Sequence, residues 1–65
     1  MDKNKLIVGH KYLRRRAATY GGHAVEAESW LECVQITTAG AVFWGAEGLE
    51  NLTEEQIREQ IIREA

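Results

Sequence analysis

The chain has 65 residues, of which 45% are hydrophobic and 28% charged, with no proline. This length allows one small domain, and the composition excludes a proline-rich linker and a disordered polyampholyte. We expect residues 1–65 to form a single domain. Its core is so small that a partner or a second copy could complete it.

The net charge of −2 hides a strong separation of charge along the sequence. Residues 1–16 contain six basic residues and one acidic residue, which give +5, whereas residues 17–65 contain nine glutamates and two arginines, which give −7. Such a chain can neutralise itself on folding, dimerise head to tail, or present two charged faces to different partners.

The number of cysteines indicates the cellular compartment of the protein. Cys33 is the only cysteine, whereas small secreted domains usually carry two or more disulfides. The sequence also contains no apolar run long enough for a signal peptide or a membrane span. We therefore expect a cytoplasmic protein with no membrane partner.

Taken in chain order, residues 5–45 are β-rich, with short apolar runs separated by Gly, Thr and Ala. They predict four strands: Leu6–Arg14, His23–Glu28, Trp30–Thr37 and Ala41–Trp44. Gly21 and Gly22 break the chain before the second strand. Thr38-Ala39-Gly40 predicts a tight hairpin, in which Gly40 can take positive φ.

The C-terminal part predicts a linker over residues 46–52 and a helix over residues 53–64. Thr53 and Gln56 have the spacing of a capping box, which predicts that the helix proper runs from about Glu54 to Glu64. Two pairs at i,i+4 have the favourable orientation, Glu54 with Arg58 and Glu59 with Arg63.

Three of the predicted strands contain adjacent large apolar residues: Tyr12-Leu13, Trp30-Leu31 and Phe43-Trp44. Neighbouring strand residues point to opposite faces, so both faces of the sheet carry apolar groups and one helix can cover only one of them. We expect an α+β fold, a small curled antiparallel sheet of three to four strands followed by one C-terminal α-helix. The sheet is either SH3-like and curled, or open with its second face covered by a homodimer partner or a target protein.

Three segments carry a resemblance to a known group of proteins: Val8–Arg15, Gly22–Val25 and Thr37–Trp44. Their layout resembles short phage-encoded accessory proteins with an SH3-like, curled β-sheet, which commonly start V-G-K/R-Y-x-x-R and continue with a strand, an x-x-G-x-x-F/W hairpin and an acidic tail. The resemblance covers residues 6–48. It implies a phage or prophage protein of the host cytoplasm, in a group that includes inhibitors of bacterial defence systems and modulators of transcription or replication.

The basic loop predicted at residues 14–22 is the candidate nucleic-acid contact. Arg14, Arg15 and Arg16 could neutralise phosphates while Tyr20 stacks on a base. Alternatively, the loop is solvated and its arginines pair with the acidic half of the chain. A sequence pI of about 5.6 favours this second interpretation.

Trp30 and Trp44 are candidate interface anchors, since tryptophan is enriched at binding hot spots. Either residue could instead fill the small core. Each stands next to a large apolar residue that must face the other way, so we expect at least one of the two tryptophans at an interface.

The sequence offers little for catalysis or metal binding. His10, His23 and Cys33 do not have the spacing of a zinc site, Cys33 has the character of a buried strand residue, and Ser29 lies in no hydrolase motif. We expect no enzyme, cofactor or metal. The leading hypothesis is a protein–protein interaction module that inhibits or modulates a larger bacterial or phage macromolecule through Arg14, Arg15, Arg16, Tyr20, Trp30 and Trp44. The alternative is a small nucleic-acid-binding or transcription-regulating protein that uses the basic loop.

Overall fold

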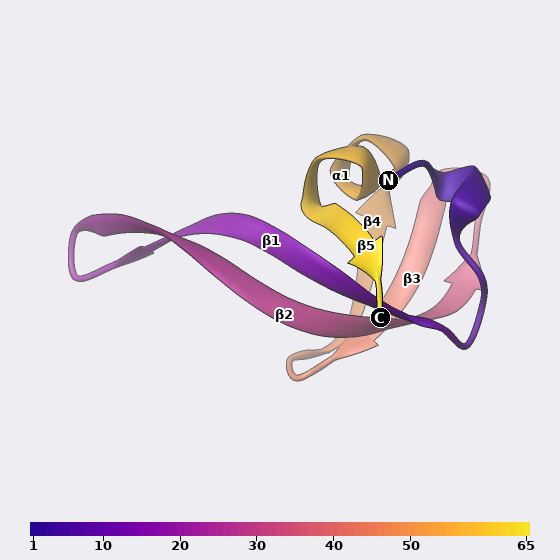
Figure 1. Ribbon diagram of the computed structural model, residues 1–65, viewed down its shortest axis with the longest axis horizontal. Coiled ribbons are helices and arrows are strands. Elements are labelled where there is room, and N and C mark those ends of the chain that lie inside the picture. The colour runs from indigo at the N-terminus through magenta and orange to yellow at the C-terminus, as the bar shows by residue number, and fades with distance from the viewer.

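The computed structural model describes all 65 residues and shows a five-stranded antiparallel sheet with one short α-helix near the C-terminus (Figure 1). The elements, in chain order, are a 3-10 helix Lys3–Lys5, β1 Lys11–Tyr20, β2 His23–Ile36, β3 Gly40–Gly45, β4 Gly48–Thr53, α1 Glu54–Gln60 and β5 Ile61–Glu64. The strand order β4-β3-β2-β1-β5 makes β4 and β5 the two edges. The predicted α+β class is confirmed, with five strands where the sequence predicts three to four.

β1 and β2 form one long hairpin that extends well beyond the rest of the molecule (Figure 1). Ten residue pairs join the strands, from Lys11 opposite Glu32 to Tyr20 opposite His23. Gly21 and Gly22 form the turn with φ values of 57° and 84°, a conformation that glycine adopts without steric cost. We call residues 16–27 the arm. Because of the arm, the molecule measures 35 Å along its longest axis but only 21 and 19 Å along the others.

Several predicted boundaries are wrong. The first strand begins at Lys11 and not at Leu6, because Gly9 turns the chain with a φ of 91° and Leu6 is drawn into the core. The second and third predicted strands are one continuous strand, since Ser29 lies opposite Arg14 in an unbroken ladder. Most of the predicted linker 46–52 belongs to β4, which forms a hairpin with β3.

The turn between β2 and β3 lies where the sequence predicts it, but Gly40 does not take positive φ. The Oγ1 atom of Thr37 accepts a hydrogen bond from the Gly40 amide at 3.1 Å, and the Thr37 amide donates to the Gly40 carbonyl at 2.9 Å. A Cβ atom at Gly40 would collide with the backbone carbonyl of Leu52. Glycine is therefore needed here for the close approach of β3 to β4.

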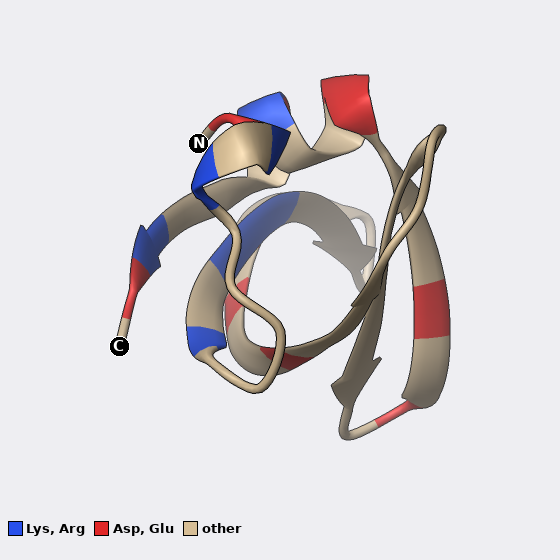
Figure 2. Cartoon of the chain, turned by 90° about the vertical axis from the view of Figure 1, so that its right-hand side faces the viewer, with Lys and Arg blue, Asp and Glu red and all other residues tan.

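The core lies on the inner face of the curled sheet, which Figure 2 shows bending back on itself. Tyr12 and Phe43 meet there edge to face, with ring centroids 6.4 Å apart and an interplanar angle of 87°. The buried apolar residues are Leu6, Tyr12, Leu31, Cys33, Ala41, Phe43, Leu52, Ile57 and Ile61. The curl and α1 thus close one face of the sheet, and the other face carries side chains exposed to solvent.

α1 begins as the sequence predicts. The Thr53 Oγ1 atom accepts from the Gln56 amide at 3.2 Å, and the Gln56 side chain accepts from the Thr53 amide at 2.9 Å, which completes the capping box. With seven residues, α1 is far from long enough to cross a bilayer, and it is the only α-helix.

The helix ends at Gln60 and does not continue to Glu64. Ile61 and Ile62 are β-branched, and the free edge of β1 offers backbone partners to the chain that follows the helix, so these residues start β5. The predicted pair between Glu59 and Arg63 therefore does not form. Glu54 pairs with Lys3 at 3.2 Å and not with Arg58.

Replacing Thr53 with Ala should lower the free energy of unfolding by about 1 kcal/mol, because the Gln56 amide loses its acceptor. Thr38→Ala is the matched control, since Thr38 is exposed and its side chain makes no hydrogen bond. Urea denaturation of both variants measures the difference. An equal loss in the two variants would contradict a capping role for Thr53.

Candidate functional site

Both tryptophans lie on the outer face of the sheet. Trp30 on β2 is opposite Leu13 on β1, and Trp44 on β3 is opposite Glu32 on β2 and Leu49 on β4. The side chains of directly opposite residues share one face, so all of these groups point outward. Trp30 is 46% exposed, Trp44 55% and Leu49 65%. We call Leu13, Trp30, Trp44 and Leu49 the tryptophan face.

The two indole rings border one shallow groove. It has a volume of about 390 Å³ and is lined by Lys11, Trp30, Leu31, Glu32, Trp44, Gly45 and Ala46. Glu32 lies on β2 directly across from Trp44 and two residues from Trp30, so it is a neighbour of both tryptophans on the same face and lines the same groove. Large apolar groups exposed together on one face indicate an interaction site.

A cation already lies against one of the rings. The Arg63 guanidinium carbon is 5.3 Å from the centroid of the Trp30 ring, which is within cation–π range. Arg63 comes from β5 and lies opposite Leu13, so it approaches Trp30 from the β1 side of the sheet. The groove lies on the β3 side of the same ring.

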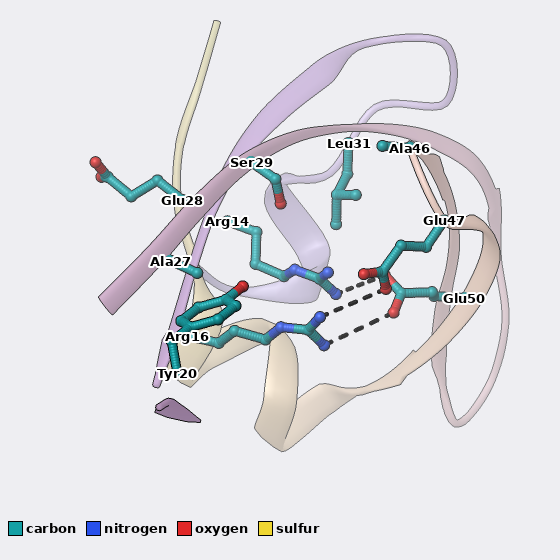
Figure 3. A pocket seen from close by; sticks show the side chains of 10 residues that line it. All are labelled: Arg14, Arg16, Tyr20, Ala27, Glu28, Ser29, Leu31, Ala46, Glu47 and Glu50. Carbon is teal, nitrogen blue, oxygen red and sulfur yellow. Dashed lines mark hydrogen bonds and ion pairs between the residues drawn. The ribbon is translucent and has the colours of Figure 1, made fainter. Parts of the chain in front are cut away.

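Arg14 lies on the inner face and is nearly buried, with 4% of its surface exposed. Its Nη1 atom donates to the Glu50 carboxylate at 2.6 Å, which joins β1 to β4 across the curl of the sheet (Figure 3). The Nε atom of Arg14 is buried and has no partner. Arg14 is thus held inside the protein and is not available to a ligand at the surface.

Arg15 and Arg16 are also paired with carboxylates. Arg15 points to the other side of the hairpin and meets Glu28 at 2.9 Å and Glu26 at 3.7 Å. Arg16 lies 3.5 Å from Glu47 and 3.9 Å from Glu50 (Figure 3). The pKa of Arg15 is raised, chiefly by its hydrogen bond to Glu28.

The prediction of a basic loop at residues 14–22 is therefore wrong. Residues 14–20 belong to β1, because they pair continuously with β2, and only Gly21 and Gly22 form a turn. Tyr20 stands near the tip of the arm, 66% exposed, and helps to line a small hollow that also contains Arg14 and Arg16 (Figure 3). The six predicted binding residues thus separate into two groups. Arg14, Arg15, Arg16 and Tyr20 lie on the β1–β2 hairpin, and Trp30 and Trp44 lie on the tryptophan face.

Sequence reasoning missed the residues that complete each group. Glu28, Glu47 and Glu50 hold the arginines, and the separation of charge along the chain was the signal for such pairing. Lys11, Glu32, Leu49 and Arg63 surround the tryptophans. Only the strand register brings these four residues together, and the sequence alone does not specify that register.

The buried core contains two titratable groups. Burial raises the pKa of the Cys33 thiol from its usual 9.0. Burial also raises the pKa of the Tyr12 phenol from 10.0, with a contribution from Glu64. The Tyr12 hydroxyl accepts from the Ile7 amide at 2.7 Å and donates to Glu64 at 3.3 Å. As the sequence predicts, Cys33 is buried. The structure contains no group of three or more His, Cys, Asp or Glu side chains that could hold a metal ion.

Comparison with known proteins gives no match: no family model, no curated protein and no solved structure matches this chain. These comparisons therefore add no functional information to the geometry of the chain.

Replacing Glu50 with Ala should lower the free energy of unfolding by about 3 kcal/mol, because it leaves the Arg14 charge buried without a partner. Glu28→Ala removes a carboxylate from an exposed pair and should cost less than about 1 kcal/mol. Urea denaturation of both variants measures the contrast. If the two variants lose the same amount, the Arg14–Glu50 pair does not hold β1 to β4.

Stability should fall as the pH rises above about 9. In the unfolded chain Cys33 and Tyr12 lose their protons at their usual pKa values, whereas the folded chain keeps these protons to higher pH, so raising the pH favours unfolding. Urea midpoints at pH 7 and pH 10 measure this loss. The Cys33→Ala variant should show a smaller decrease between the two pH values, and an identical decrease would contradict the assignment to Cys33.

Proposed function

We propose that this protein is a non-enzymatic interaction module that binds a larger protein through its tryptophan face. The observation that carries the proposal is the exposure of Trp30 and Trp44 side by side on one face of the sheet. Tryptophan residues in such positions are the usual anchors of protein interfaces. Their burial against a partner would remove a large apolar area from water.

The arrangement of the cations supports a protein partner over a nucleic acid. A nucleic-acid contact through the predicted basic segment needs its arginines to be free to neutralise phosphates. Here Arg14, Arg15 and Arg16 all have carboxylate partners, and Arg14 is nearly buried. The three arginines join β1 to β2 and to the β3–β4 hairpin.

The resemblance to short phage-encoded accessory proteins supports the class of partner. We propose that the tryptophan face binds a bacterial protein complex, such as a defence system, and that binding inhibits or modulates it. A fold with an outwardly exposed aromatic face and no deep enclosed pocket fits a protein that acts by occupying a surface.

The test is capture of a partner from a bacterial lysate with the tagged chain, followed by titration of the purified partner. The wild-type chain should bind, and a Trp30→Ala/Trp44→Ala double variant should bind at least about 30-fold more weakly, the effect of losing hot-spot residues. Both side chains are half exposed, so the double variant should fold, which circular dichroism can verify.

Tyr20→Ala is the matched control, because it removes an exposed aromatic ring from the arm and leaves the tryptophan face intact. It should bind as the wild type does. The proposal is wrong if every protein captured by the wild-type chain is also captured by the double variant. It is also wrong if Tyr20→Ala weakens binding as much as the double variant does.

A further inference from the structure

The groove between the two tryptophans contains a carboxylate that has no partner within the protein. Glu32 is partly buried on β2, and it forms none of the ion pairs or hydrogen bonds that hold Glu28, Glu47 and Glu50. Lys11 lies opposite Glu32 in the register of β1 and β2, yet no ion pair joins them. The groove thus combines two exposed aromatic rings with the Glu32 carboxylate and the Lys11 ammonium, neither of which forms an ion pair.

We propose that this groove binds an arginine side chain of the partner protein, a conclusion that rests on the proposed function. The faces of aromatic rings carry negative potential and attract cations. A guanidinium between Trp30 and Trp44 could contact a ring face and also donate to the Glu32 carboxylate. An anion would meet the Glu32 carboxylate, so Lys11 alone does not make the groove an anion site.

The protein itself shows that a guanidinium fits against one of these rings. Arg63 lies over Trp30 with its guanidinium carbon 5.3 Å from the ring centroid. Arg63 approaches over Leu13 from the β5 side, and it is not among the residues that line the groove. The other side of Trp30, toward Trp44, is therefore open to a second arginine from outside the chain.

The form of the groove also favours a side chain over a whole small molecule. It is shallow and bordered by Gly45, at the end of β3, and Ala46, in the turn that follows, which are both small. A flexible arginine can lay its aliphatic stem along the indoles while its head reaches Glu32. The tryptophan face would then supply apolar area, and Glu32 would select partners with a basic residue at the centre of the contact.

The probe is a short peptide, acetyl-Gly-Arg-Gly-amide, titrated into the ¹⁵N-labelled chain while the indole N–H resonances are followed by NMR. Both indole resonances should shift, with a dissociation constant on the order of 1 mM for a single side chain. The same peptide with citrulline has the shape of arginine but no charge, and it should give no shift. Equal shifts with the two peptides would overturn the proposal.

Glu32→Gln keeps the size of the side chain and removes its charge. It should weaken binding of the arginine peptide about tenfold, the effect of losing a charge-assisted hydrogen bond. Glu55→Gln is the control, because Glu55 is exposed on α1 and has no ion pair. It should bind as the wild type does, and equal binding by both variants would overturn the assignment to Glu32.

Binding of the larger partner protein by the same variants distinguishes failure of this inference from failure of the proposed function. If Trp30→Ala/Trp44→Ala loses the partner and Glu32→Gln also binds it about tenfold more weakly, both proposals stand. If the double variant loses the partner while Glu32→Gln binds as tightly as the wild type, the tryptophan face is the interface but the arginine site is wrong.

Discussion

A chain of this length has enough apolar residues to enclose one face of its sheet, and this constraint determines what the other face presents. The inner face takes Tyr12 and Phe43, and the curl of the sheet together with α1 covers them. Since neighbouring strand residues point to opposite faces, Leu13 and Trp44 must then face outward. No further helix is available to cover them. The exposed tryptophan face follows from the same alternation that builds the core.

The charges that are separated along the sequence form ion pairs within the folded protein. The arginines near the middle of β1 meet glutamates from β2, β4 and the turn between β3 and β4, so the basic N-terminal segment and the acidic remainder lie against each other (Figure 2). The exposed pairs contribute little each. The Arg14–Glu50 pair differs because Arg14 is nearly buried and joins strands that are far apart in the sheet order. The Arg14–Glu50 pair thus links β1 to the edge strand β4 across the curl of the sheet.

Local signals in the sequence predicted the local structure well. The capping box at Thr53 and Gln56 begins α1, and Gly21-Gly22 forms a turn. The predicted strand boundaries that depend on pairing with a neighbouring strand were wrong. β5 exists because β1 offers a free edge to Ile61, and β2 continues through Ser29 because β1 lies opposite it. The adjacency of Trp30 and Leu31 required the two side chains to lie on opposite faces, and Leu31 is buried while Trp30 is exposed. It could not show that both tryptophans share one face, which depends on the register between β2 and β3.

That register is also what gives Glu32 its environment. On a differently paired sheet, Glu32 would be an ordinary solvated glutamate among the many of the acidic half. Opposite Trp44 and two residues from Trp30, it is the one carboxylate among the residues that line an aromatic groove. Arginine residues elsewhere in the chain are satisfied by carboxylates or, in the case of Arg63, lie over Trp30. Arg58, on the exposed side of α1, is the only exception. The Lys11 ammonium lies at the groove without forming an ion pair with Glu32, and no arginine of the chain enters it, so a guanidinium for this groove would come from a partner.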